Sequence, residues 1–199
     1  LHNSAGSGTL DGALHLDGGS RLGSSGDGLR ITGAVSGTGG LTADGGSVTL
    51  AHVGNRFDGP VAVSAGSLRL EGGDALPDAA TVSLAGSGRL LLAQDETIGA
   101  LAGSAGTAVL LGNATLTAGG NQADSRFDGV LQGDGSLVKR GSGRLTLAGD
   151  NQHLGPTRAQ DGVLALAGAD ERLADAGQLV VEGGTLDLGG GRETVAGVL

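Results

Sequence analysis

The most regular feature of the chain is a short triplet in which two apolar residues flank a variable one. The middle residue ranges from Arg to Asp, so we expect the outer two side chains to face a core and the middle one to face water. This alternation predicts many short, half-buried β-strands. The triplets occupy residues 61–63, 68–70, 82–84, 90–92, 145–147, 164–166, 179–181 and 186–188.

Glycine separates these triplets and argues against helices. The chain has 43 Gly, placed singly or in short groups between the apolar runs. A Gly inside a helix costs about 1 kcal/mol, and nearly every window long enough for a helix contains one. The one candidate for a helical or turn excursion, residues 72–80, contains Pro77 and is predicted to be a loop.

A long module occurs twice. The segment from Gly37 aligns with the segment from Gly133 at an offset of 96 to 97 residues. We predict one segment over residues 1–199, with a module at 35–102 and a related module at 131–199, joined by 103–130. The matched positions are Leu41 with Leu137, Asn55 with Asn151, Gly59-Pro60 with Gly155-Pro156, Gly66 with Gly162, and Glu96-Thr97-Ile98 with Glu193-Thr194-Val195.

A shorter unit of about 20–25 residues recurs inside each module, which is the size of one coil of a parallel β-solenoid. The predicted fold is therefore all-β, a parallel β-helix of about eight to ten coils. Stacking at roughly 4.8 Å per coil would give a rod on the order of 40–50 Å. We expect a right-handed coil, although the sequence itself leaves the handedness open.

Composition supports a thin core. The chain has no Cys, Met, Trp or Tyr and only two Phe, so its apolar content comes almost wholly from Leu, Val and Ala. Each buried Leu or Val contributes roughly 1.5–3 kcal/mol, which suffices if every one faces inward. A sandwich would need aromatic bulk between its sheets. Disorder is disfavoured because 38% of the residues are hydrophobic.

The charge of the chain, its apolar stretches and its first residues limit the partners and the kind of protein that the sequence is compatible with. A net charge of −9 with scattered basic residues disfavours nucleic acid and anionic membranes as partners. No 18-residue apolar stretch is present, so no membrane-spanning helix is predicted. Without Cys there is no disulfide scaffold. The start, "LHNSAGSG", has neither Met nor a signal peptide, which we interpret as a processed or excised piece of a longer chain.

The two Phe both lie in the tetrapeptide Arg-Phe-Asp-Gly, at Arg56–Gly59 and Arg126–Gly129. Phe57 follows Asn55, whereas Phe127 precedes the opening of the second module. The two tetrapeptides thus lie at different places in the module, and we interpret each Phe as a plug at a coil corner rather than as half of a duplicated recognition site.

The sequence contains no recognisable catalytic, cofactor-binding or metal-binding residues. His2, His15, His52 and His153 are dispersed without His-x-x-x-His spacing. The Ser-rich stretch 22–28 contains no Gly-x-Ser-x-Gly elbow and has no His near it in the chain. The Gly-Gly-x-Gly-x-Asp repeat of calcium-loaded β-rolls does not occur. No cofactor is expected.

Two adjacent acidic pairs are the candidates for carboxylates that cut a glycan, because β-helix enzymes assemble such groups from successive coils. They are Asp95-Glu96 and Asp170-Glu171. Neither lies beside the basic and aromatic groups that hold a sugar. The counterpart of Asp95-Glu96 is Arg192-Glu193, so only half of the pair is repeated. We therefore predict that residues 1–199 have no enzymatic activity. The sequence leaves open whether a parent chain has an enzymatic domain elsewhere.

One segment carries a family pattern. Residues 131–168 contain Gly-x-Gly-x-Leu-x-Lys from Gly133 to Lys139 and Gly-x-Gly-x-Leu-x-Leu-x-Gly-x-Asn from Gly141 to Asn151, followed by the turn 155–157 and a closing Gly-x-Leu-x-Leu from Gly162. This resembles the autotransporter-associated β-strand repeat of Gram-negative passenger domains, which belong to type V secretion. Leu154 departs from it where the family often has an aromatic residue, and Ala43 stands where the second copy has Lys139.

The resemblance implies a β-helical passenger that a C-terminal outer-membrane barrel, which this chain lacks, exports to the bacterial surface or medium. It implies partners of three kinds: that barrel, a host cell surface, and neighbouring passengers. One hypothesis is a structural stem that presents an N-terminal effector or adhesive region and assists folding and export. The alternative is an adhesin or self-associating segment. An outward row of polar residues on one face would favour it, with Thr32, Thr49, Thr81, Thr115 and Thr146 as candidates.

Overall fold

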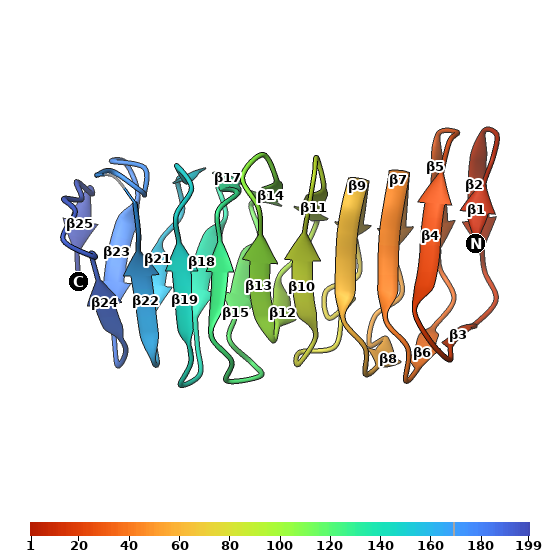
Figure 1. Cartoon of the computed structure of the whole chain (residues 1–199), viewed down its shortest axis with the longest axis horizontal. Helices are drawn as coiled ribbons and strands as arrows, with labels where there is room; N and C mark the ends of the chain where they lie inside the picture. Colours follow the sequence, from red (N-terminus) through yellow and green to blue (C-terminus); the bar gives the residue numbers. More distant parts are fainter. Residues whose placement is uncertain (169) are drawn as a thin grey trace.

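The computed structural model describes residues 1–168 and 170–199, and these residues form a parallel β-solenoid of about 10 turns, drawn as a rod in Figure 1. The described residues contain strands and turns but no helix. Accordingly, no helix among them is long and apolar enough to cross a membrane. The predicted all-β parallel β-helix and its number of coils are confirmed.

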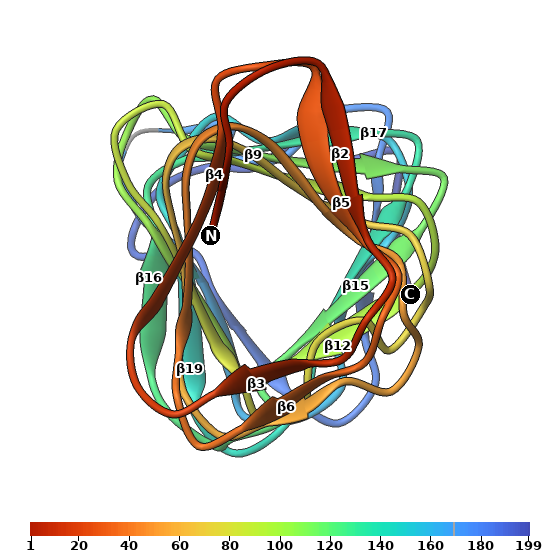
Figure 2. The same ribbon diagram turned by 90° about the vertical axis from the view of Figure 1, so that its right-hand side faces the viewer.

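Each coil contributes up to three strands, and the coils together have a three-sided outline along the rod (Figure 2). We name the sides faces A, B and C in chain order. Face A contains β1 (His2–Asn3), β4 (Ser20–Ser24), β10 (Thr81–Leu84), β13 (Ala100–Gly103), β16 (Ser125–Phe127), β19 (Arg144–Leu147), β22 (Val163–Leu166) and β24 (Thr185–Asp187). Face B contains β2 (Ser7–Leu10), β5 (Gly28–Ile31), β11 (Arg89–Leu92), β14 (Ala108–Gly112), β17 (Val130–Gly133) and β20 (Gln152–His153).

Face C contains β3 (Leu14–Leu16), β6 (Val35–Gly37), β8 (Arg56–Phe57), β12 (Glu96–Ile98), β15 (Thr115–Ala118), β18 (Ser136–Lys139), β21 (Thr157–Ala159), β23 (Gln178–Val181) and β25 (Gly197–Val198). Two longer strands, β7 (Leu41–Leu50) and β9 (Val61–Leu70), continue from face A to face B. β9 turns the corner at Gly66, whose φ is +72°. A side chain there would meet the chain below, because a Cβ would lie 2.0 Å from the carbonyl oxygen of Gly46.

Every strand pairs in parallel with the strand one coil away, and the apolar triplets become ladders. Leu50, Leu70 and Leu92 stack in register on face B and are nearly or fully buried. The predicted pattern of a buried, a half-buried and a buried residue is confirmed for the triplets at 61–63, 68–70, 82–84, 90–92 and 145–147. The core is thus a column of Leu and Val inside the rod.

In the last two triplets the prediction was wrong for the final outer residue of each, and also for Val180, a middle residue that is buried, whereas Leu179 is buried as predicted. Val181 and Leu188 are each 36% exposed. For Val181 the reason is thin coverage by the next coil: β25 pairs with β23 at Gln178 and Leu179, and beyond them Val181 meets only the backbone of Leu199, whose side chain is exposed. Alternation sets the direction of a side chain, but its burial also requires a coil on each side.

Residues 72–80 form a loop, as predicted, and this loop interrupts face C. Its coil has no strand on that face, so the sheet β3-β6-β8 and the sheet that begins at β12 are separate. Ala75 and Leu76 nevertheless point inward and are almost completely buried. The rod is therefore continuous through the core and through faces A and B, but not through the hydrogen-bond ladder of face C.

The two copies of the long module lie on different faces. Leu41 begins a face A stretch, whereas its counterpart Leu137 lies on face C. Leu68 lies on face B and its counterpart Leu164 on face A. The cause is coil length: paired residues are 19 apart at Thr81 and Ala100 but 24 apart at Gly103 and Phe127. An offset of 96 is not a whole number of such coils, so the second copy is rotated by one face.

The two Phe are buried at different places. Phe57 ends β8 on face C, and Phe127 ends β16 on face A, each 2% exposed or less. Both strands lead into a corner that contains Gly, at Gly59 and Gly129. The Arg-Phe-Asp-Gly tetrapeptide is therefore not one duplicated site, as predicted.

Candidate functional surface

The acidic pair Asp95-Glu96 connects three coils. The Glu96 carboxylate accepts hydrogen bonds from the backbone N–H groups of Ala75 and Leu76 in the previous coil, at 3.0 and 2.8 Å. Asp95 accepts one from the backbone N–H of Thr115 in the next coil, at 2.7 Å. Both carboxylates therefore satisfy N–H groups of neighbouring coils, and Glu96 does so where face C lacks a strand.

Glu96 is buried, with 3% of its surface exposed. Burial raises the pKa of Glu96 from 4.5 to about 7, against the opposing effect of the two backbone N–H donors, and the nearby carboxylates of Asp74 and Asp78 raise it further. A proton on this carboxyl thus binds more tightly in the folded chain than in the unfolded one. The Glu96 carboxyl therefore has a structural role, and it is too deeply buried to contact a substrate.

The second acidic pair has the same kind of role. Asp170 accepts a hydrogen bond from the backbone N–H of Arg192, and Glu171 accepts one from Thr194, both about one coil further on. Glu193, the counterpart of Glu96, accepts from the backbone N–H groups of Arg172 and Leu173 at 2.8 and 2.7 Å. The repeated Glu is therefore a repeated cap on the preceding coil.

Asn55 and Asn151 form a matched pair of buried caps. Each side chain accepts a hydrogen bond from a backbone N–H in the coil before it, from Val35 and Leu131 respectively. Each also donates from Nδ2 to a carbonyl oxygen in the coil after it, Asn55 to Ala75 at 2.8 Å and Asn151 to Arg172 at 3.0 Å. The sequence shows that an Asn recurs at the same place in both modules, but it does not show which backbone groups these side chains bind.

Lys139 is the one lysine of the chain and is 1% exposed. Its Nζ donates to the carbonyl oxygens of Arg140 and Gly141 at 2.7 Å and of Asp161 at 3.2 Å. Burial lowers the pKa of Lys139, while the carboxylates of Asp161 and Asp124 raise it. The ammonium group therefore joins two successive corners of the rod.

Two of the dispersed histidines lie within hydrogen-bond distance of a serine in the next coil. His2 Nε2 lies 3.2 Å from Ser25 Oγ, and His15 Nδ1 lies 3.2 Å from Ser36 Oγ. His15 Nε2 also lies 3.1 Å from Asp17 Oδ1, so Ser, His and Asp form a chain. The side chains of His15 and Asp17 are 65% and 90% exposed, and both act at a surface open to water. Such contacts across coils cannot be read from the sequence.

Of the other two histidines, His52 is half-buried and His153 is buried. His153 is 2% exposed, and its Nε2 lies 2.7 Å from Thr157 Oγ1. Burial lowers the pKa of His153 to about 4, so it is neutral at physiological pH. The Nδ1 atoms of His52 and His153 are buried without a hydrogen-bond partner among the described residues. Nor do those residues contain a group of three or more His, Asp or Glu that could hold a metal ion.

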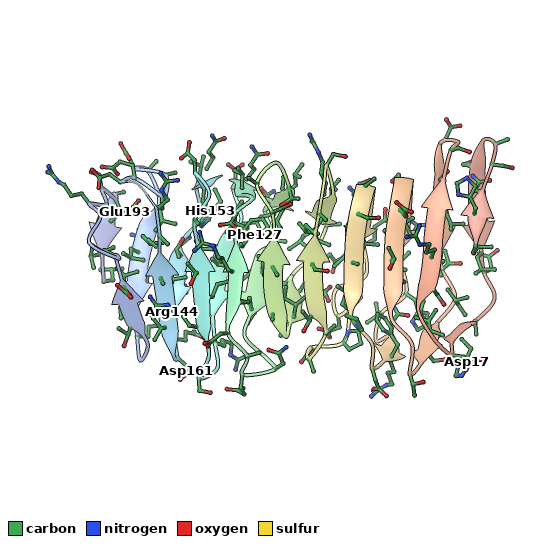
Figure 3. All side chains as sticks on the ribbon, viewed as in Figure 1. Asp17, Phe127, Arg144, His153, Asp161 and Glu193 are labelled. Carbon is green, nitrogen blue, oxygen red and sulfur yellow. The ribbon has the colours of Figure 1, made fainter. Side chains whose placement is uncertain are left out.

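The five candidate Thr residues do not form one outward row, so they give the attachment hypothesis no support. Thr49 lies on face B, Thr81 and Thr146 on face A, Thr115 on face C, and Thr32 just after β5. The longest outward row on face B is mixed instead: Thr9, Arg30, Thr49, Arg69, Leu91, Leu110, Gln132 and Gln152 are in register from coil to coil. The side chains around the rod are drawn in Figure 3.

Ion pairs between coils occupy much of the surface charge. Arg30 pairs with Glu71, which also pairs with Arg69 of its own coil, and Arg144 pairs with Asp187 near the C-terminal end. The hydrogen bond from Arg30 lowers the pKa of Glu71. Exposed pairs of this kind contribute little stability each, typically about 0–1 kcal/mol.

Two surface hollows lie side by side near the interruption of face C. The first, of about 520 Å³, is lined by Arg56, Asp58, Asp74 and Pro77 among others. The second, of about 700 Å³, follows the corner between faces C and A. Asp78 lines both hollows. Charged and polar side chains contribute to both hollows, and the exposed lining of each is about equally polar and apolar.

Comparison with known proteins finds one family model that matches part of each module. Residues 43–70 and 137–166 match the Passenger-associated-transport-repeat model. A stretch of 87 residues, 44% of the chain, is 36% identical to the Adhesin BmaC autotransporter of Brucella suis biovar 1 (strain 1330). The chain spans only 2% of the length of that relative. No solved structure gave a significant match.

Proposed function

We propose that this chain is a structural stem of an autotransporter passenger, because it is a β-solenoid with two stretches that match the passenger-associated transport repeat and one stretch similar to an adhesin autotransporter. The stem holds an effector or adhesive region of the parent protein away from the cell surface, and its folding assists export of the passenger. Its partner in export is the outer-membrane barrel of the parent chain, and its location is the bacterial surface or the medium.

The observation that carries this proposal is the uninterrupted stack of coils. Face A alone pairs strand to strand from β1 to β24, and the Leu and Val column continues beneath it. In a solenoid each coil contacts only its neighbours, so stiffness along the rod follows from the repeated interface. The outer surface adds ion pairs between coils and caps such as Glu96.

The same architecture suits folding during export. Pairing partners on the ladders lie only 19 to 24 residues apart, so a coil can form as soon as that much chain has emerged. A formed coil offers an open strand edge and an apolar surface on which the next coil stacks. Free energy released by stacking outside the cell would then favour outward movement of the chain.

A matched pair of substitutions in the parent protein tests this proposal. Leu131→Asp places a charge in the fully buried column, whereas Gln132→Asp places the same charge on the outward side of the same strand. We expect the amount of passenger at the cell surface to fall several-fold for Leu131→Asp and to stay near wild type for Gln132→Asp. Equal export of both variants would contradict a role of stacking in export.

The second candidate function is attachment by the segment itself, to a host surface or to a neighbouring passenger. The long mixed row on face B and the two hollows favour it, because both present polar groups in a fixed spacing. Beads that carry residues 1–199 separate the two functions. Beads that clump or adhere to host cells at physiological salt support attachment, and inert beads support a stem.

We propose no catalytic role for the segment. The carboxylates of Asp95, Glu96 and Glu193 are engaged with backbone N–H groups. The Ser36, His15 and Asp17 arrangement is open to solvent and lines none of the hollows described above. Hydrolysis of a chromogenic ester above the rate of a Ser36→Ala variant would overturn this part of the proposal.

A further inference from the structure

The two hollows adjoin, because Asp78 lines both, and we treat them together as one groove along the rod. Residues that line them come from six successive coils, namely Arg56, Asp78, Thr97, Thr117, Arg140 and Asp161. At roughly 4.8 Å per coil, the groove extends about 24 Å parallel to the axis. A groove of this shape suits an extended polymer better than a compact small molecule.

The groove has a structural cause in the lengths of the loops that connect face C to face A. One residue, Gly99, connects β12 to β13, whereas six residues, 119–124, connect β15 to β16. The long loop stands out beside the short one, and Thr97 and Thr117 are left at the base of the step. Towards the other end, the missing face C strand at residues 72–80 opens the first hollow.

The long loop is held in place by defined hydrogen bonds. Gln122 accepts from the backbone N–H of Ser142 at 2.7 Å and from its hydroxyl at 3.1 Å. Asn121 donates to Thr81 Oγ1 at 3.1 Å. Because each contact joins the loop to another coil, the wall of the groove is fixed before any ligand arrives.

The charged groups in the groove point to the ligand chemistry. Among the described residues, the guanidinium groups of Arg56 and Arg140 have neither an ion pair nor a side-chain hydrogen bond, although most other Arg residues are paired. Both lie in the groove, near the carboxylates of Asp58, Asp78 and Asp161. The groove thus offers the carboxylates of Asp58, Asp74, Asp78 and Asp161 as acceptors, the two guanidinium groups as donors, and hydroxyl groups that can do both.

A ligand that matches this mixture of groups must both donate and accept hydrogen bonds. An acidic polymer would meet the Asp carboxylates, and a basic peptide would meet the Arg guanidinium groups, so each would face like charge. Sugar hydroxyls donate to carboxylates and accept from guanidinium and Thr or Ser hydroxyls. The rise of one coil is also comparable to the length of one sugar unit in an extended glycan.

We propose that this groove binds a linear, neutral oligosaccharide, with Arg140 and Thr117 among the groups that contact it. The inference goes beyond the stem function and supplies a ligand class for the attachment function. Affinity is expected to be modest, because the groove has no exposed aromatic face: Phe57, the one aromatic residue that lines it, is 2% exposed.

The test uses the ¹⁵N-labelled chain of residues 1–199 and four probes: β-1,4- and α-1,4-linked glucose hexasaccharides, a hexasaccharide of uronic acids, and hexalysine. We expect saturable amide shift changes at Thr97, Thr117 and Ser142 with at least one neutral hexasaccharide. Arg140→Ala should weaken that binding about tenfold, as expected for loss of a hydrogen bond to a charged group. Arg89→Ala, at an exposed and unpaired Arg on face B, should leave it unchanged.

Three outcomes would overturn the proposal. They are an absence of shift changes with both neutral hexasaccharides, equal binding by the Arg140→Ala and Arg89→Ala variants, or binding confined to the uronate or lysine probe. Thr117→Val removes one hydroxyl from the groove at nearly constant volume and serves as a second variant. Export of the Leu131→Asp variant reports on the stem function separately, so the failure of one proposal leaves the other testable.

Discussion

Replacement of Glu96 by Gln tests the cap that connects the face C loop to the next coil. The two oxygens of Glu96 accept the N–H groups of Ala75 and Leu76, and the site is 3% exposed. Gln keeps one acceptor oxygen and places an NH₂ donor against the other N–H. One buried N–H then lacks an acceptor, which costs about 1–3 kcal/mol.

The raised pKa of Glu96 determines how the stability difference between the wild type and the Gln variant changes with pH. Because burial raises the pKa of Glu96 from 4.5 to about 7, the folded chain holds a proton that the unfolded chain releases. The stability from this group is present below pH 4.5 and is lost as the pH rises through 7. The difference between the two pKa values corresponds to about 3 kcal/mol at most. The Gln variant lacks this titration.

We therefore expect Glu96→Gln to be less stable than the wild type by about 1–3 kcal/mol at pH 4.5, with the gap narrowing as the pH rises to 8. Urea unfolding followed by circular dichroism at several pH values measures it. Glu193→Gln is the matched control, since Glu193 makes the same two contacts at a half-exposed site where water can replace them. A gap that widens with pH would refute the reasoning, because the two N–H donors would then outweigh burial.

Two further predictions concern the corners of the rod. Gly66→Ala should destabilise the chain by more than about 2 kcal/mol and Gly54→Ala by about 1–2 kcal/mol. Both Gly have a φ of +72°, but a Cβ at Gly66 would lie 2.0 Å from a carbonyl oxygen, whereas at Gly54 it would meet nothing within 4 Å. Equal unfolding midpoints would contradict the close approach. Lys139→Met should cost about 2–4 kcal/mol, because three carbonyl oxygens lose the ammonium donor. A change below about 0.5 kcal/mol in urea unfolding would show that water replaces that donor.

The sequence by itself determined the type of fold. Period-2 alternation in triplets such as Val61–Val63 fixes which side chains point inward, and frequent Gly fixes short strands with tight corners. The absence of bulky side chains fits a narrow column of Leu and Val. The two transport repeats also show in the sequence, because their caps and corners recur at a nearly constant offset.

The tertiary structure decided which residues share a face and which meet across coils. Position around the rod depends on the accumulated length of all preceding corners, which vary from one residue at Gly99 to six at 119–124. A repeat that looks equivalent in sequence is therefore rotated by one face, and the Thr candidates are spread over three faces.

The same dependence explains why the caps and the groove could not be predicted. Glu96 reaches Leu76, and Arg140 lies along the same groove as Thr97 and Asp78, because coils of particular lengths place them there. Local alternation determines whether a side chain points in or out. Which neighbours it meets is set by residues about 20 positions away, whose register the triplet pattern does not contain.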